Sequence, residues 1–132
     1  MKVGVRLPNL YLVFSHELSE KQKNEVYEKF DVEGIFNMPD SLKAIWSQIP
    51  ADIPSVSEYI EPVKEWLEKN ICERDYILIE GDFGATYLIV KWAFSKNCKP
   101  IYATTERKVT ETHVGEKIIV NRVFEHVRFR FY

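Results

Sequence analysis

Two apolar runs on either side of a glycine-containing break predict a strand, a helix and a second strand in the middle of the chain. Residues 76–79 (YILI) are rich in β-formers, and residues 81–84 (GDFG) interrupt them. Residues 85–94 are almost continuously apolar and too long for one strand, which predicts a buried helix. Pro100 then opens a strand over residues 101–103. This spacing predicts a βαβ unit with parallel strands.

The N-terminal part of the chain has the same order of elements. Residues 10–14 (LYLVF) are continuously apolar, as in a strand buried on both faces of a parallel sheet. Ser19 with Gln22 three residues later is a capping box, which predicts a helix from about Glu20. The apolar pair at residues 35–36 predicts a short second strand and completes the first βαβ unit.

Residues 38–70 predict two helices joined by an extended connector. Either Asp40 or Ser41 can cap the first helix, and Ser55 begins a capping box for the second. Pro62 lies inside the second helical pattern. That helix is therefore either kinked at Pro62 or restarts with the proline in its first turn.

The hydrophobic period changes after Arg107 and predicts an antiparallel extension. Residues 108–112 and 117–123 alternate as two strands around a turn at residues 113–116. Residues 124–132 predict a final, half-buried strand. Its alternation predicts Val127, Phe129 and Phe131 on one face and His126, Arg128, Arg130 and Tyr132 on the other. The predicted fold class is α/β, with a Rossmann-like, mostly parallel sheet flanked by helices.

Length and charge limit the classes of function. The 132 residues predict a single domain over residues 1–132, and apolar residues make up 45% of them, enough for a well-filled core. The net charge of −2 argues against a long nucleic acid as partner, because such binding neutralises many phosphates. Two distant cysteines and no apolar run of about 20 residues predict a reduced, cytoplasmic protein without a signal peptide or membrane span.

Polar residues follow three of the predicted parallel strands at their carboxyl ends, where open α/β sheets bind ligands. The candidates are Ser15 and His16 after the first strand, Gly81, Asp82, Phe83, Gly84, Ala85 and Thr86 after the third, and Thr104, Thr105 and Arg107 after the fourth. The glycine turn lacks both the dinucleotide fingerprint and the lysine of a Walker loop. It remains a possible cradle for a phosphate or ribose at a helix N-terminus.

Several of these residues also have simple structural explanations. Asp82 can be a turn or cap residue, and the two threonines at residues 104–105 can cap a turn. Arg107 can pair with a neighbouring glutamate on the surface. His126 alternates with core residues, which favours a structural role, and Trp46 is either a core residue or the support of a loop over the site.

Five segments in order resemble a small CRISPR-associated family. They are LYLVFSHELSEKQ, WSQIP, IEGDFGATY, PIYATTER and FEHVRFRFY, and together they extend over nearly the whole chain. The family belongs to the Csx group of type III CRISPR accessory proteins, which have a Rossmann-like fold. The resemblance implies a ring nuclease, which degrades the second messenger cyclic tetra-adenylate and so ends antiviral signalling.

The candidate residues suit that chemistry without a metal or another cofactor. A ribose 2′-hydroxyl attacks the neighbouring phosphate, Arg107 would stabilise the added charge, and His16 would transfer a proton. A ring of four identical nucleotides is two-fold symmetric, which predicts a homodimer with a composite site. Two alternatives remain open, a protein that sequesters the ring without cutting it and a non-catalytic sensing or interaction module.

Overall fold

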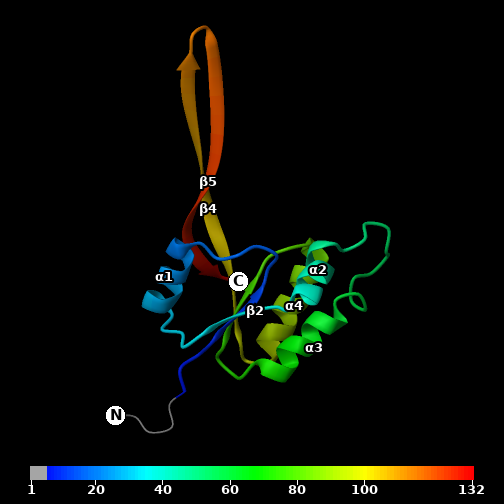
Figure 1. Ribbon diagram of the computed structural model, residues 1–132. Helices are drawn as coiled ribbons and strands as arrows, with labels where there is room; N and C mark the ends of the chain where they lie inside the picture. Colours follow the sequence, from blue (N-terminus) through cyan, green and yellow to red (C-terminus); the bar gives the residue numbers. More distant parts are fainter. Residues whose placement is uncertain (1–5) are drawn as a thin grey trace.

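A five-stranded sheet forms the centre of the computed structural model, which describes residues 6–132. Its strands are β1 (Leu10–Val13), β2 (Ile35–Asn37), β3 (Tyr76–Ile79), β4 (Lys99–Val114) and β5 (Lys117–Phe131). They lie in the order β2-β1-β3-β4-β5, the first four parallel and β5 antiparallel to β4 (Figure 1). The prediction of a mostly parallel α/β sheet with an antiparallel C-terminal extension is confirmed.

Helices cover both faces of the sheet, and a separate hydrophobic cluster lies on each face. The helices are α1 (Glu20–Lys29), α2 (Asp40–Ser47), α3 (Glu61–Asn70) and α4 (Phe83–Ser95). Val26 of α1 packs in the cluster that contains Leu78 of β3. Ile89 of α4 packs on the opposite face in the cluster that contains Ile77, together with residues of α2 and α3. No helix in the described part of the chain combines the length and apolar character needed to cross a membrane.

Helix α1 begins with the cap that the sequence predicts, whereas α2 and α3 begin with other caps than those predicted. The predicted capping box is confirmed, with the Ser19 Oγ accepting from the Gln22 backbone N–H and the Gln22 side chain accepting from Ser19. Pro39, not Asp40 or Ser41, is the N-cap of α2. The capping box predicted at Ser55 is wrong. The second helix instead begins at Glu61 with proline in its first turn, as one of the two alternatives predicted.

The apolar helix α4 is buried on one side only, so the prediction of a fully buried helix is corrected. Ala85, Ile89 and Ala93 are buried against the sheet. Tyr87 and Phe94 are 64% and 53% exposed. Only one side of α4 packs in the cluster with Ile77 and Ile79 of β3. A continuous apolar run therefore does not establish that every face is buried.

Strand β4 continues far beyond the predicted end at residue 103. Residues 104–107, predicted to be a polar turn, are strand and pair with β5. The reason is the antiparallel partner, which extends the ladder through these β-forming residues up to a two-residue turn at Gly115, whose φ is +62°. Residues 105–125, hereafter the arm, project from the core as a long two-stranded ribbon (Figure 1).

A break in register at the base of the arm changes which side chains of β5 face inward. Thr104 pairs with Arg128, but Thr105 pairs with His126, so Val127 is the extra residue of a β-bulge. His126 and Phe129 are buried, whereas Val127 is exposed. The simple alternation predicted for residues 124–132 is therefore wrong for Val127 and His126, whereas Phe131 shares the face of Phe129, as predicted, and both rings pack against Phe30.

Candidate functional site

The carboxyl edge of the parallel sheet brings together the segments that follow β1 and β3. Val13 and Ile79 are paired neighbours at the ends of these two strands. Ser15 and His16 follow β1 and are exposed, and the glycine turn that begins at Gly81 follows β3 and is also exposed. β1 connects to β2 on one side while β3 lies on its other side, so the two loops flank the point where the strand order reverses.

The side chain of Trp46 packs against the glycine turn. Its indole Nε1 donates a 2.8 Å hydrogen bond to the backbone oxygen of Glu80, and its ring is buried. A Cβ built on Gly81 would lie 2.6 Å from the same nitrogen, so glycine is required for this close approach. The core role predicted for Trp46 is therefore confirmed, and its indole also binds the backbone directly before the glycine turn.

The N-terminus of α4 is capped by the protein itself. The Asp82 carboxylate accepts a 2.9 Å hydrogen bond from the Ala85 N–H, which confirms the cap interpretation of Asp82. The Ala85 N–H is therefore already bonded, and the Asp82 carboxylate occupies the position at which a phosphate was expected. Ala85 is buried, and the Thr86 hydroxyl is buried without a hydrogen-bond partner among the described residues. Of the predicted cradle, only residues 81–84 are open to a ligand.

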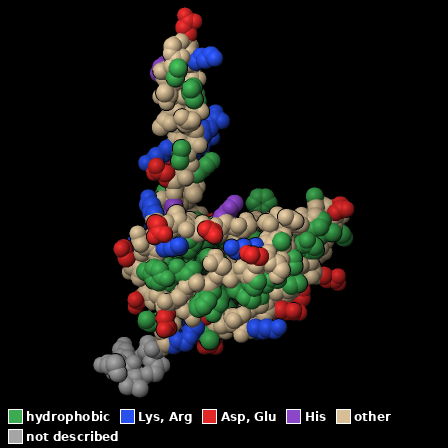
Figure 2. Space-filling view, viewed as in Figure 1, with side chains coloured by type: hydrophobic (Ala, Val, Ile, Leu, Met, Phe, Trp, Pro, Cys, Tyr) green, Lys and Arg blue, Asp and Glu red, His purple; other side chains and the backbone are tan. Residues whose placement is uncertain are grey.

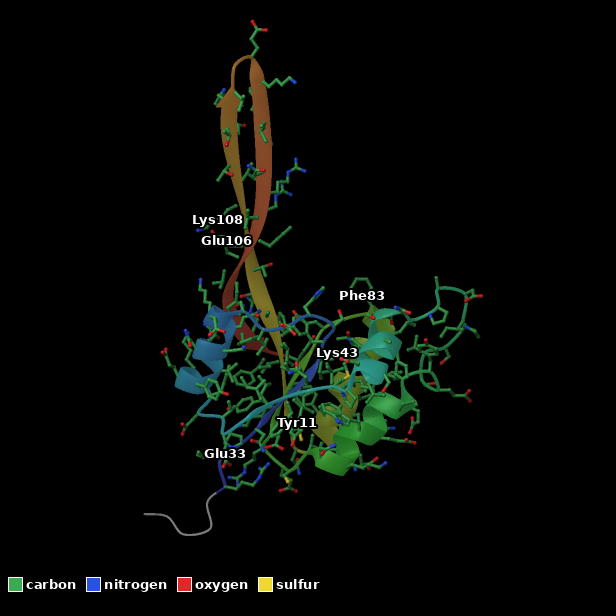
Figure 3. All side chains as sticks on the ribbon, in the orientation of Figure 1. Tyr11, Glu33, Lys43, Phe83, Glu106 and Lys108 are labelled. Atoms are coloured by element: carbon green, nitrogen blue, oxygen red, sulfur yellow. The ribbon has the colours of Figure 1, made fainter. Side chains whose placement is uncertain are left out.

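Phe83 is the most exposed large apolar side chain at this edge. It is 95% exposed and is the first residue of α4, directly after the Asp82 cap. Figure 3 shows its ring rising from the same side of the core as the arm, well to the right of the arm's base. An aromatic ring held in water on a rigid helix offers a planar apolar face to a ligand.

Glu80 is a site residue that the sequence analysis missed. It is half-buried at the end of β3, where its Oε1 accepts a 3.1 Å hydrogen bond from the Ala103 N–H. Burial raises the pKa of Glu80 above its usual value. The Ala103 bond and the nearby imidazoles of His126 and His16 offset this only in part. A carboxyl group with a raised pKa beside a histidine is a candidate acid or base.

The raised pKa of Glu80 predicts a pH-dependent cost in stability. Because the folded pKa exceeds the unfolded value of about 4.3, the native state holds more protons above that pH, and stability falls as pH rises through the folded pKa. Glu80→Gln keeps the acceptor for Ala103 but carries no charge. We expect it to raise the melting temperature at pH 8 and to change it little at pH 4.

Thermal unfolding followed by circular dichroism between pH 4 and pH 8 measures this effect. Glu116→Gln, at the exposed tip of the arm, is the control and should follow the wild-type profile. An equal change for Glu80→Gln at both ends of the pH range would show that burial of its charge does not limit stability.

The residues predicted to follow the fourth strand are only partly at the site. The Thr104 hydroxyl donates to the Arg128 carbonyl oxygen at 2.9 Å and accepts from the Arg128 N–H at 3.3 Å, so it binds the neighbouring strand. Thr105 and Arg107 are exposed on the arm. At the strand rise, Arg107 lies about 13 Å along β4 from Ala103. Arg128 and Arg130 are exposed and lie one position on either side of the pair that Ala103 forms with Phe129. The Arg130 guanidinium donates to the Tyr102 hydroxyl at 3.2 Å, so Arg128 is the candidate cation.

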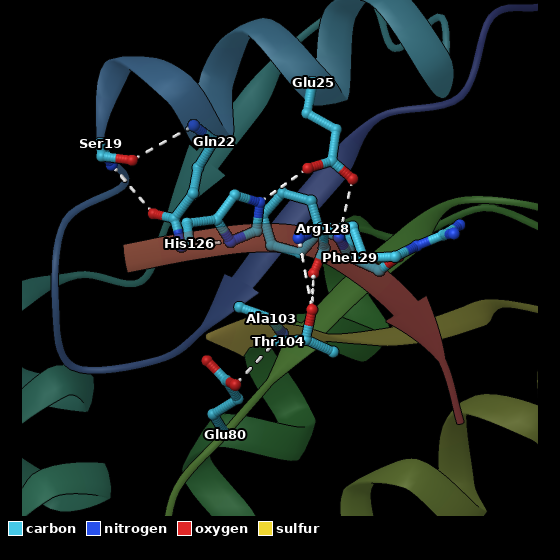
Figure 4. Close-up of polar contacts among 9 residues, drawn as sticks. All are labelled: Ser19, Gln22, Glu25, Glu80, Ala103, Thr104, His126, Arg128 and Phe129. Carbon is cyan, nitrogen blue, oxygen red and sulfur yellow. Dashed lines mark hydrogen bonds and ion pairs between the residues drawn. The ribbon is translucent and has the colours of Figure 1, made fainter. Parts of the chain in front are cut away.

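A buried network fixes β5 against α1 below the arm. Glu25 and His126 are both 9% exposed, and the His126 Nε2 lies 2.6 Å from the Glu25 Oε1 (Figure 4). The second Glu25 oxygen accepts from the Phe129 N–H at 2.7 Å. The side-chain amide nitrogen of Gln22 lies 3.4 Å from the His126 Nδ1. Because this amide nitrogen can only donate, Nδ1 is the acceptor, and the proton of the neutral imidazole is assigned to Nε2. These contacts support the structural role predicted for His126.

The connector between α2 and α3 forms a wall beside the glycine turn. A Cβ on Gly84 would lie 3.6 Å from Val56 in this connector. The connector also borders an open surface hollow of about 570 Å³. Its lining residues are Ile53, Pro54, Ser55, Ser57, Glu58 and Tyr59. Within residues 6–132, no three His, Cys, Asp or Glu side chains are grouped as metal ligands.

Comparison with known proteins gives a family for this chain. The model of the family described as "Uncharacterized protein MJ1673 family" matches residues 8–130. The chain belongs to this family. A relative, "Uncharacterized protein MJ1673" of Methanocaldococcus jannaschii, is 43% identical over 126 residues, which cover 96% of this chain and 98% of the relative. No solved structure matches the chain. The MJ1673 family name carries no activity, so the resemblance to ring nucleases stays a prediction.

Proposed function

We propose that this member of the MJ1673 family binds cyclic oligoadenylate at the carboxyl edge of its sheet and cleaves cyclic tetra-adenylate to linear products. Cleavage would end the signal that activates type III CRISPR effectors, which act in the cytoplasm. The sequence resemblance supports this proposal. The strand order also supports it, because a Rossmann-like sheet binds nucleotides at the point where the order reverses.

The exposed ring of Phe83 is the observation that carries the proposal. A phenylalanine that is 95% exposed on a rigid helix start is a platform on which an adenine can stack. Stacking does not require a basic surface, which suits a chain with a net charge of −2. Two polar groups at the same edge of the sheet, His16 and Glu80, are of the kinds that transfer protons.

The reaction follows from these groups. His16 removes the proton from a ribose 2′-hydroxyl, and the 2′-oxygen attacks the adjacent phosphorus. The bond to the 5′-oxygen breaks, and Glu80, protonated, supplies a proton to that leaving oxygen. The products are a 2′,3′-cyclic phosphate and a free 5′-hydroxyl. Arg128 stabilises the negative charge that grows on the phosphate oxygens.

Incubation with cyclic tri-, tetra- and hexa-adenylate in the presence of EDTA tests the proposal. We expect linear adenylates ending in a 2′,3′-cyclic phosphate from cyclic tetra-adenylate, because the attacking group belongs to the substrate. Chromatography and mass spectrometry identify the products. Activity that disappears in EDTA and returns with a divalent ion would contradict the mechanism.

Phe83→Ala is expected to weaken binding of cyclic tetra-adenylate. Loss of one stacked base costs about 1–3 kcal/mol, so the dissociation constant should rise about 10-fold or more. Tyr27→Ala is the matched control, since Tyr27 is a half-exposed aromatic residue on α1. If isothermal titration shows that both variants bind like the wild type, the stacking role of Phe83 is contradicted.

Binding without cleavage is the second candidate. The Asp82 cap favours it, because a carboxylate bonded at the start of α4 opposes further negative charge on a nearby phosphate. This candidate predicts tight binding with no linear product after long incubation. Failure to bind any cyclic oligoadenylate would instead favour a non-catalytic interaction module.

A further inference from the structure

The arm carries apolar side chains far from the core of its own chain. Figure 1 shows it standing clear of the sheet and helices, and Figure 2 shows apolar groups interspersed with charged ones along its length. Its ion pair between Lys108 and Glu125, 2.9 Å, joins its own two strands. A two-stranded ribbon alone is marginally stable in water, so a surface that covers the arm would stabilise it.

One face of the arm is the more apolar. Cross-strand partners share a face, and the pairs formed with Arg107, Val109, Glu111 and His113 define this one. The large apolar side chains of the arm are all 46–67% exposed. Those on this face are Val109, Ile118, Val120 and Phe124. We call this face the Phe124 face. The opposite face has three exposed apolar side chains, Val114, Ile119 and Val123, and lacks an aromatic ring; it also contains the polar pair of Thr110 and Asn121.

The charge of the arm indicates that its partner is a protein. Its acidic side chains are Glu106, Glu111, Glu116 and Glu125, and its basic side chains are Arg107, Lys108, Lys117 and Arg122. The two sets cancel, whereas a ribbon that binds nucleic acid needs an excess of positive charge. A neutral ribbon with a row of exposed valine, isoleucine and phenylalanine side chains suits an apolar protein surface.

The chain itself has such a surface. Helical spacing places Tyr87 and Phe94 on the same side of α4 as Phe83, and both are exposed. α4 runs from the carboxyl edge of the sheet toward its opposite edge. The strand of ten residues in the arm is about 33 Å long. A core of about 100 residues is about 34 Å across, so the arm can extend along a whole second copy.

We propose that two copies of the chain associate head to head, with the Phe124 face of each arm lying along α4 of the other copy. The arm rises from the same edge as the candidate site, so a copy held along the arm lies over that site. The Phe124 face supplies eight residues of each arm, and α4 with the surrounding edge of the same copy supplies the others of the 20–30 residues per side that a stable interface needs. The two sites then face each other around one two-fold ring, a consequence that rests on the proposed function.

Light scattering without ligand tests the dimer. The wild type should have twice the 15.6 kDa chain mass at micromolar concentration. Val120→Asp on the arm and Tyr87→Asp on α4 should each raise the dimer dissociation constant about 100-fold or more, because each buries an unpaired carboxylate. Thr110→Asp, on the opposite face of the arm, is the control and should remain dimeric. Circular dichroism verifies folding, and Ile118→Asp replaces Val120→Asp if that variant does not fold.

Hydrogen exchange tests where the arm lies. Arm amides should be protected in the wild type and lose protection in Tyr87→Asp, although Tyr87 is on a different element. A monomeric wild type would overturn the dimer, and unchanged arm protection in Tyr87→Asp would overturn α4 as the docking surface. Neither measurement uses a nucleotide, so a dimer that fails to bind cyclic tetra-adenylate would contradict the proposed function alone.

Discussion

His16→Ala is expected to lower the single-turnover rate of cyclic tetra-adenylate cleavage about 100-fold, because the variant cannot remove the proton from the 2′-hydroxyl. Binding of the ring should change little, since Phe83 still supplies its stacking surface. Rapid quench with radiolabelled ring measures the rate, and equilibrium titration measures the affinity.

The two arginine variants separate the sequence-based assignment from the structural one. Arg128→Ala should slow cleavage about 100-fold at every pH, because Arg128 adjoins Phe129, the strand partner of Ala103, whose N–H binds the Glu80 carboxylate. Arg107→Ala should leave the rate within about threefold, since the side chain begins about 13 Å along the arm. A large loss in Arg107→Ala and none in Arg128→Ala would restore the sequence-based assignment.

The catalytic assignment of His16 has its own decisive outcome. If His16→Ala remains folded by circular dichroism and cuts at the wild-type single-turnover rate, His16 is not the base. Glu80 would then be the remaining titratable group at this edge with a position suited to proton transfer.

Glu25→Ala is expected to cause the largest loss of stability. It removes the carboxylate that accepts from both His126 and the Phe129 N–H, and it leaves these two buried donors without their partner. Breaking such a buried pair costs about 3 kcal/mol or more. For a domain of this size the melting temperature should fall by about 10 °C.

Chemical and thermal denaturation measure this loss. Glu20→Ala is the matched control on the same helix, because its side chain is exposed and its pair with Lys23 is a surface ion pair of small value. A loss equally small in both variants would show that the network around His126 does not stabilise the attachment of β5 to α1. Glu25→Gln should be intermediate, since it keeps one acceptor oxygen.

Local signals in the sequence were enough for the parallel core. The wholly buried runs of β1 and β3 are continuous apolar segments, because both faces of a central strand meet helices. The capping box at Ser19 sets the start of α1 through contacts within four residues. His16 and Gly81 could be assigned to one edge because the carboxyl ends of parallel strands meet there.

Features that depend on distant partners could not be obtained in this way. The length of β4 depends on its pairing with β5, and the bulge at Val127 turns His126 inward against the alternation of its own strand. The raised pKa of Glu80 arises from burial and from contacts with residues remote in sequence.

The sequence by itself therefore determined the order of the elements, the parallel core and the edge at which His16 and the glycine turn meet, since each depends on local patterns and chain direction. Only the tertiary structure decided that Phe83 is exposed to water and that Arg107 lies on the arm. Both features depend on contacts between residues that are far apart in the chain.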